Sequence, residues 1–192
     1  MSRLPLLPTL VVLVAVGIMV RLGVWQIERL HEKQAMIARY SAAMAQPELD
    51  WRIGVPLGGD GAWRRIRVRC VSFGVPEVVG GRSAFGQGGW ATRAQCITPS
   101  GSITVVAGWS AGLAPGRLAP QEVAGIGVPE KAGGLHLVAD PPLGGLAANA
   151  RPDPRELPNN HFSYAVQWFA FAATALVIYA IALWRRRLPA DG

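Results

Sequence analysis

The feature that most constrains this chain is an apolar stretch near its carboxyl end. Phe162 to Trp184 is a run of 23 residues without a charged side chain, and Arg185, Arg186 and Arg187 follow it directly. A helix needs about 20 apolar residues to cross the hydrocarbon core of a bilayer. Aromatic residues lie near both ends of the run, as they do where a span meets the lipid headgroups. The stretch therefore predicts a transmembrane helix.

A second, weaker apolar stretch lies near the amino end. Leu4 to Val20 is a run of 17 uncharged residues, and apolar residues continue past Arg21. A cleaved signal peptide is the rival interpretation, but the residues after the run are bulky and offer no small-residue cleavage site. We therefore expect an uncleaved amino-terminal transmembrane helix over residues 1–27.

The positive charges around the two spans give conflicting signals about orientation. Cytoplasmic flanks of membrane spans carry an excess of Lys and Arg, so the triple arginine favours a cytoplasmic carboxyl end. Only Arg3 precedes the first span, whereas Arg21, Arg29, Lys33 and Arg39 follow it, and these would keep the middle of the chain inside. We let the denser carboxyl-terminal cluster decide. We expect a multi-pass protein of the cell inner membrane with both termini cytoplasmic and the centre periplasmic.

The composition agrees with a membrane protein and argues against a nucleic-acid partner. Half of the residues are apolar (51%) and 16% are charged, against about a quarter charged in soluble domains. The net charge is +7, but the basic residues outside the flanks are scattered, with no lysine-rich run and no aromatic–basic motif. Nucleic-acid binding needs basic residues that cluster on one face or helix. We expect membrane lipid, and no nucleic acid, as a partner.

The segment between the spans begins as a helix and then changes character. Residues 27–44 repeat apolar or small residues at steps of three and four, and Pro47 ends the pattern. We expect the first helix to continue above the membrane over residues 28–47 and to pack on a central domain over residues 48–158. The second span then covers residues 159–185, and residues 186–192 form a cytoplasmic tail.

The sequence of the central domain predicts strands separated by loops rich in glycine and proline. Arg65 to Val71 alternates polar and apolar residues, which is typical of a half-buried strand. Residues 89–98 and 102–109 predict two more strands joined by a turn at 99–101, and residues 71–79 can add another. The predicted fold class is a membrane protein of the α+β class. Two antiparallel transmembrane helices flank a small antiparallel β-rich domain, either a sheet or an open barrel.

The two cysteines leave two interpretations open. Cys70 and Cys96 match no metal-ligand or redox spacing. They form a disulfide if the domain lies in an oxidising compartment. Otherwise they are two buried thiols, since free cysteine is often buried.

No motif of a catalytic site is present in the chain. It has no glycine-rich nucleotide loop after a strand, no GxSxG and no HExxH, and its 12 acidic residues form no acid–base or nucleophile pair. We therefore expect that the protein is not an enzyme.

Of the three histidines, His161 has the most informative position, because it precedes the second apolar run at headgroup depth. On a helix, Tyr164, Ala165, Trp168 and Ala172 share its face at steps of three and four. One interpretation is an interfacial anchor with small residues for helix packing. The other is an axial ligand to a planar, hydrophobic cofactor.

A second cluster is expected at the same depth on the other span. Because the two spans are antiparallel, Trp25, Gln26 and Arg29 leave the membrane where His161 enters it. Arg21 lies about 12 Å lower along the helix, where its guanidinium must snorkel to the interface or meet an anion. An imidazole, aromatic walls and nearby arginines suit a heme, whose propionates pair with arginine. Plain anchoring remains the alternative.

Both clusters lie in stretches that resemble a known family. Gly23 to Lys33 looks like the G-x-W-Q-x-x-R-x-x-x-K signature of the surfeit locus protein 1 family, and Asn159 to Phe169 resembles its N-x-H-x-x-Y-A-x-x-W-F signature. The central domain is less similar. Cys70 stands where a glycine is usual, and residues 105–109 lack the asparagine and arginine of a V-N-R-G-W element.

The resemblance implies an assembly factor for cytochrome c oxidase. It implies binding of heme a and help with its delivery to, or retention in, oxidase subunit I. It makes His161 the axial ligand of the heme iron and carries roles over to Trp25 and Arg29. With Tyr164, Trp168 and Arg21, these are the candidate heme-binding residues. The alternative is a heme-free scaffold that docks oxidase subunit I or heme A synthase.

Overall fold

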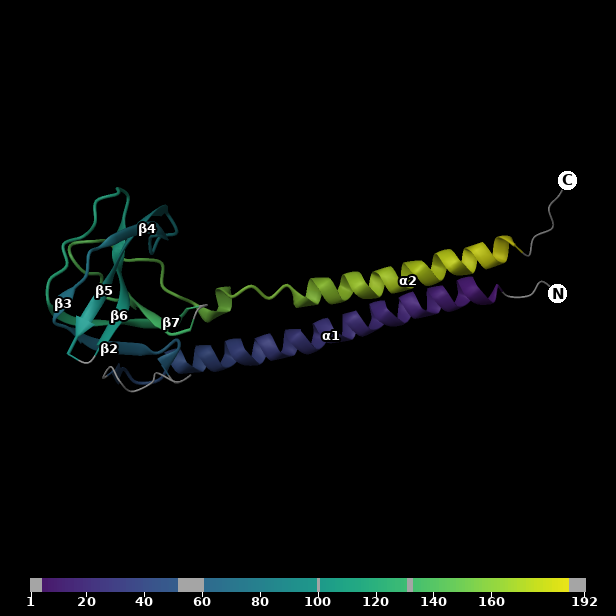
Figure 1. Ribbon diagram of the computed structural model, residues 1–192, viewed down its shortest axis with the longest axis horizontal. Coiled ribbons are helices and arrows are strands. Elements are labelled where there is room, and N and C mark those ends of the chain that lie inside the picture. Colours follow the sequence, from purple (N-terminus) through teal and green to yellow (C-terminus); the bar gives the residue numbers. More distant parts are fainter. Residues whose placement is uncertain (1–4, 52–60, 100, 131–132, 187–192) are drawn as a thin grey trace. The chain divides into compact units, whose positions relative to one another are not determined.

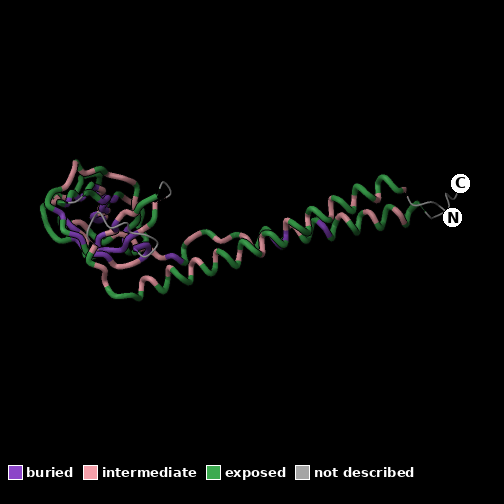
Figure 2. Tube along the Cα trace, turned by 60° about the horizontal axis from the view of Figure 1, so that its bottom comes forward, coloured by how far each residue is buried: buried purple, intermediate pink, exposed green. Residues whose placement is uncertain are grey.

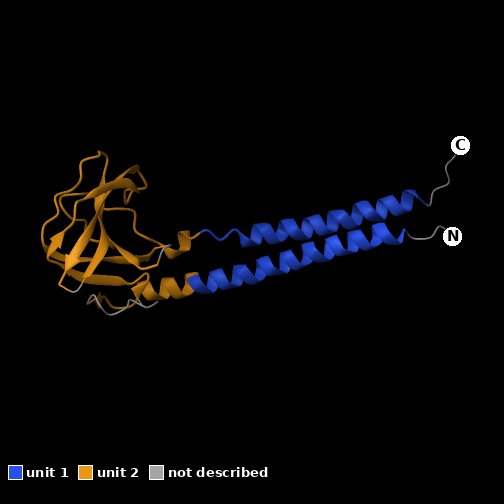
Figure 3. Ribbon diagram, viewed as in Figure 1, with its two compact units in different colours: residues 1–36, 158–192 blue, residues 37–157 orange. Residues whose placement is uncertain are grey.

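The computed structural model describes residues 5–51, 61–99, 101–130 and 133–186. Two long helices and a set of strands make up these residues (Figure 1). The chain divides into two compact units (Figure 3). Unit 1 comprises residues 1–36 and 158–192, and unit 2 comprises residues 37–157.

Unit 1 is built from two helices. α1 runs over Leu6–Met44, of which the part after residue 36 belongs to unit 2, and α2 runs over His161–Arg185. Both are long and apolar enough to cross a bilayer, and little of either apolar stretch is buried inside the protein. Figure 2 shows this as helices coloured mostly exposed or intermediate. Because helices with apolar residues on all sides need an apolar surrounding, this is a membrane protein with two spans.

Contacts between α1 and α2 show that they are antiparallel. Phe169 of α2 packs over Gly23 of α1, where an added Cβ would lie 2.7 Å from the phenyl ring. Farther along, the hydroxyl of Thr9 hydrogen-bonds to that of Tyr179. On α2 the side chain of Ala165 is buried, and Ala172 is buried one helical repeat later. Small residues therefore let the two helices approach closely, as is common between membrane helices.

Unit 2 contains one curled sheet of eight strands. Their order is β1-β2-β7-β8-β6-β5-β3, and β4 pairs with β5 off this path. The strands are β1 (Leu49–Asp50), β2 (Arg65–Cys70), β3 (Ser72–Phe73), β4 (Glu77–Arg82), β5 (Gly88–Thr98), β6 (Gly101–Ser110), β7 (Gln121–Pro129) and β8 (Leu135–Ala139). A short 3-10 helix, η2 (Pro154–Glu156), lies between the sheet and α2 in the sequence.

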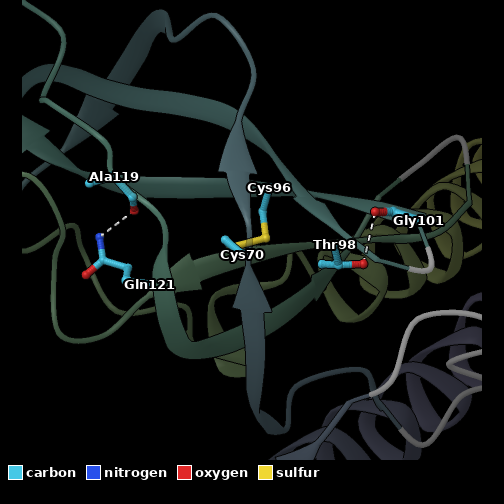
Figure 4. The surroundings of a disulfide bond; sticks show 6 residues. All are labelled: Cys70, Cys96, Thr98, Gly101, Ala119 and Gln121. Carbon is cyan, nitrogen blue, oxygen red and sulfur yellow. Dashed lines mark hydrogen bonds between the residues drawn. A yellow bond between two sulfur atoms is a disulfide. The ribbon is translucent and has the colours of Figure 1, made fainter.

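The sheet closes on itself through one stretch of chain. β2 pairs with β7, and β3, which follows β2 almost directly in the sequence, pairs with β5, so one continuous stretch of chain connects the two sides of the sheet. The backbone N–H of Val71 donates to the carbonyl of Ile97 at 2.8 Å. Cys70 and Cys96 form a disulfide at this closure (Figure 4). Of the two interpretations of the cysteines, the structure has the disulfide.

The predicted fold class is confirmed, and the sheet is mixed. The β1–β2 and β6–β8 pairs are parallel, and the other pairs are antiparallel. The alternation read from residues 65–71 is visible in β2, where Ile66, Val68 and Cys70 are buried and Arg67 and Arg69 are exposed. Buried residues of these strands, among them Ile66, Val105 and Leu137, form a hydrophobic core cluster.

Three strands were absent from the sequence analysis: β1, β7 and β8. β7 contains Gly125 and Gly127, which weaken a strand pattern. The structure gives the reason for the first glycine, since a Cβ at Gly125 would lie 2.2 Å from the carbonyl oxygen of Val138. The strand predicted over residues 71–79 is instead two strands, β3 and β4. In unit 2, the end of α1 contacts the domain through the rings of Tyr40 and Trp63, whose centroids are 5.8 Å apart.

Candidate functional site

The candidate site in unit 1 centres on a hydrogen bond between the two helices. Nδ1 of His161, the first residue of α2, lies 2.7 Å from Oε1 of Gln26 on α1. With the carboxamide oxygen as the acceptor, Nδ1 is the donor of this hydrogen bond. A neutral ring protonated at Nδ1 keeps a free lone pair on Nε2, and such a nitrogen can ligate a metal.

Aromatic side chains lie on either side of this pair in the sequence. Trp25, which precedes Gln26, is 43% exposed, and Tyr164, one helical turn after His161, is 50% exposed. Trp168 is partly buried and meets Phe171 edge-on, with ring centroids 6.2 Å apart. The four-residue stripe predicted on α2 is therefore divided. Ala165 and Ala172 are buried, whereas Tyr164 stays accessible to a flat apolar ligand.

The two candidate arginines pair with carboxylates of their own helix. A guanidinium nitrogen of Arg21 lies 3.9 Å from Oε2 of Glu28, and Arg29 forms an ion pair with Glu32. Arg21 thus extends toward the end of the span, which agrees with snorkelling and provides an anion for its charge. Both guanidinium groups are well exposed, so an incoming carboxylate can compete for them.

The single imidazole of this site suits a metal ion that is already bound in a cofactor and needs only one protein ligand. Within the described ranges, no group of three or more His, Cys, Asp or Glu side chains can hold a metal ion. Iron in a porphyrin already has four nitrogen ligands and needs one or two axial ones. Nε2 of His161 can supply one, and the amide of Gln26 fixes the ring, as hydrogen bonds to metal-ligating histidines commonly do. The residues present therefore fit a heme.

Sequence reasoning located this site but assigned Gln26 no role. It placed Gln26 with Trp25 and Arg29 at the depth of His161, and the structure brings Gln26, rather than either neighbour, into hydrogen-bond contact with the imidazole. The signal was present, because Gln26 belongs to the G-x-W-Q pattern.

Comparison with known proteins shows which family the chain belongs to. A sequence profile of the SURF1 family matches residues 13–173, which is most of the chain and includes the greater part of α1 and the first half of α2. The chain belongs to the SURF1 family. The resemblance of the two terminal motifs to this family is thereby confirmed, and SURF1 proteins are known as assembly factors of cytochrome oxidase. A search of curated protein sequences found no match. The matched range includes both Gln26 and His161.

Proposed function

We propose that this SURF1 protein binds heme a during cytochrome c oxidase assembly and assists its delivery to, or retention in, subunit I. The observation that carries the proposal is the Nδ1–Oε1 hydrogen bond of 2.7 Å between His161 and Gln26. This bond holds an imidazole at the membrane boundary with its metal-binding nitrogen free.

Each remaining site residue has a role in the proposal. The exposed faces of Trp25 and Tyr164 stack on the porphyrin, and Trp168 supports the same helix face deeper in the membrane. Arg29 and Arg21 exchange their pairing with Glu32 and Glu28 for the heme propionates. Heme a is cargo here, so the protein holds the iron through one axial nitrogen and catalyses no reaction.

The proposed orientation rests on two independent features. The disulfide of Cys70 and Cys96 favours a domain in an oxidising compartment, which is the periplasm in a cell with an inner membrane. The basic cluster after α2 favours a cytoplasmic carboxyl end. Together they support a periplasmic unit 2 and two cytoplasmic termini, and they outweigh the basic residues that follow the first span.

The experiment is an absorption spectrum of the full chain, purified in detergent from cells that synthesise heme a. We expect the spectrum of a histidine-ligated heme in the wild-type protein and its loss in His161→Ala. The matched control is His31→Ala, because His31 is an exposed residue of α1. A colourless wild-type protein, or equal heme in both variants, would instead support the heme-free scaffold that docks subunit I or heme A synthase.

A further inference from the structure

β4 presents an edge that lacks the usual protection against pairing. On one side it pairs with β5, and the strand pairings of the described residues give it no second neighbour. Natural proteins protect such edges with charges, prolines or bulges. The stretch from Val78 to Gly81 has neither a charge nor a proline, and the charged residues Glu77 and Arg82 stand at the two ends of the strand.

The hydrogen-bond pattern shows which backbone groups of β4 point outward. The N–H of Ser83 donates to the carbonyl of Gln87 at 2.9 Å, so these two residues form a hydrogen-bonded pair across the β4–β5 hairpin. In an antiparallel ladder such pairs alternate with pairs whose polar groups point away from the partner. Arg82 must therefore point outward, and its carbonyl does accept the N–H of Ala150 at 2.7 Å.

Only one end of this outer edge is covered in the described part of unit 2. Residues 148–150 run antiparallel to it, with a bridge between Ser83 and Asn149. The alternation points the N–H and C=O groups of Gly80 and Val78 in the same outward direction, beyond this cover. Those groups are available to a further strand.

A groove of about 480 Å³ lies beside the open edge. β4 forms one wall, and β5, β6 and β8 contribute residues to its lining. The apolar part of the lining includes Val79, Ala91, Val106 and Val138. These side chains can receive every second residue of an extended peptide, because alternate side chains of a strand point to the same face.

The polar residues of the groove favour an anionic ligand. Oε1 of Glu130 lies 3.6 Å from a guanidinium nitrogen of Arg93 and 3.3 Å from Nδ1 of His136. Arg82 has no carboxylate partner among the described residues, so the lining contains two arginines and one carboxylate. Burial lowers the pKa of His136 despite the nearby Glu130, so this imidazole is neutral at pH 7. Nδ2 of Asn149 is buried and lacks a hydrogen-bond acceptor within the described residues.

We infer that this groove binds an extended, acidic segment of a partner protein as an added strand on β4. Main-chain hydrogen bonds to Gly80 and Val78 hold the segment, as in other cases of strand addition. Apolar side chains of the segment enter the groove, and its carboxylate pairs with Arg82. The site lies entirely in unit 2 and does not depend on heme binding.

The test is a selection from a displayed library of random eight-residue peptides on the full chain in lipid nanodiscs. We expect enriched peptides to alternate apolar residues and to contain Asp or Glu. Gly80→Pro should reduce their binding at least tenfold, because proline removes an N–H that points away from β5 and leaves the β4–β5 ladder intact. The matched control is Gly112→Pro, at an exposed glycine that has open space around it.

A second variant, which changes a charge, tests the inference independently in case Gly80→Pro disturbs the fold. Arg82→Glu should move the selection from acidic to basic peptides. Peptides that bind Gly80→Pro as well as wild type, or an acidic preference unchanged by Arg82→Glu, would overturn the inference. So would a doubled mass in light scattering that Gly80→Pro abolishes, since the occupant of the edge would then be a second copy of this chain.

Discussion

At the scale of single residues, the most informative contact is the one between His161 and Gln26. The sequence placed the two side chains at one depth, because antiparallel spans must bring the end of one beside the start of the other. It could not show which residue of α1 reaches the imidazole, since that depends on the rotation of each helix about its axis. The structure resolves this choice in favour of the amide of Gln26.

The role of Gln26 can be measured apart from the iron ligand itself. We expect Gln26→Leu to weaken heme retention by about 10–100-fold, the usual effect of removing the partner of a metal-ligating histidine. Gln26→Glu should keep the heme, because a carboxylate also accepts from Nδ1. Heme transfer to apomyoglobin measures the retention. Gln34→Leu, at an exposed residue of the same helix, is the control, and equal losses in the two leucine variants would contradict the assignment.

A second prediction concerns Glu48 in unit 2. Burial opposes ionisation of its carboxyl, but hydrogen bonds from Arg67 and Arg65 outweigh this and hold the pKa of Glu48 below its ordinary value of about 4.5. The folded state then binds this proton less readily than the unfolded state. The stabilisation is therefore fully present above about pH 4.5 and is lost as the pH falls below that value.

We expect Glu48→Gln to lower the free energy of unfolding at pH 7 by about 1 kcal/mol, because the ion pairs are partly exposed. The variant should also lose less stability than wild type between pH 5 and about pH 3. Thermal unfolding of the full chain in detergent measures both effects. Glu122→Gln is the control, since Glu122 is exposed and lies 3.9 Å from Arg67. Parallel pH profiles for wild type and Glu48→Gln would refute the prediction.

At the scale of helices and strands, the sequence predicted best where a side-chain period was unbroken. The apolar run of α2 and the alternation of β2 are both found in the structure. Strand β7 was not predicted, because Gly125 and Gly127 stand where side chains would have shown the alternation. Those glycines are set by close approach to backbone from other strands or loops, which a single sequence does not reveal.

The close approach of α1 and α2 gives a test of helix packing. A Cβ at Gly23 would lie 2.7 Å from the ring of Phe169, whereas a Cβ at Gly17 has nothing within 4 Å. We expect Gly23→Leu to destabilise the helix pair by about 1–3 kcal/mol, the usual cost of overpacking. Gly17→Leu, on the same helix, should have no such effect. Denaturation in mixed micelles gives the comparison, and similar losses in both variants would argue against this packing.

Gly125 of β7 gives a second packing test, this time in the sheet. Gly125→Ala places a methyl group 2.2 Å from a backbone oxygen of β8, which cannot rotate away as a side chain would. We expect a loss of folded unit 2 in this variant. Gly88→Ala, at a β5 glycine with nothing within 4 Å of its Cβ, should fold normally. Resistance to limited proteolysis separates the two outcomes.

At the scale of the whole molecule, the protein combines a membrane helix pair with a curled sheet. The sequence predicted this division from composition alone, because apolar runs and glycine-rich alternating segments occupy different parts of the chain. It did not predict how the sheet closes. Closure joins β3 to β5 and β2 to β7, and these pairings are separated widely in the sequence.

The disulfide at the closure gives the prediction that belongs to this scale. We expect reduction of Cys70–Cys96 to lower the stability of unit 2 by about 2–4 kcal/mol, as for loops of similar length. Protein purified without reductant should not react with maleimide until it is reduced. Cys70→Ala/Cys96→Ala should show the same stability as the reduced wild-type protein. Maleimide labelling of the unreduced native chain would contradict both the bond and the proposed compartment.

The closed sheet also limits the order in which the chain can fold. β2 is made early, but its ladder partner β7 emerges only after most of the domain has been synthesised. The β2–β7 ladder therefore cannot form until residues near 129 are available. In the periplasmic orientation proposed above, chaperones that hold unfolded segments would meet this protein after its first anchor has inserted and before its second has done so.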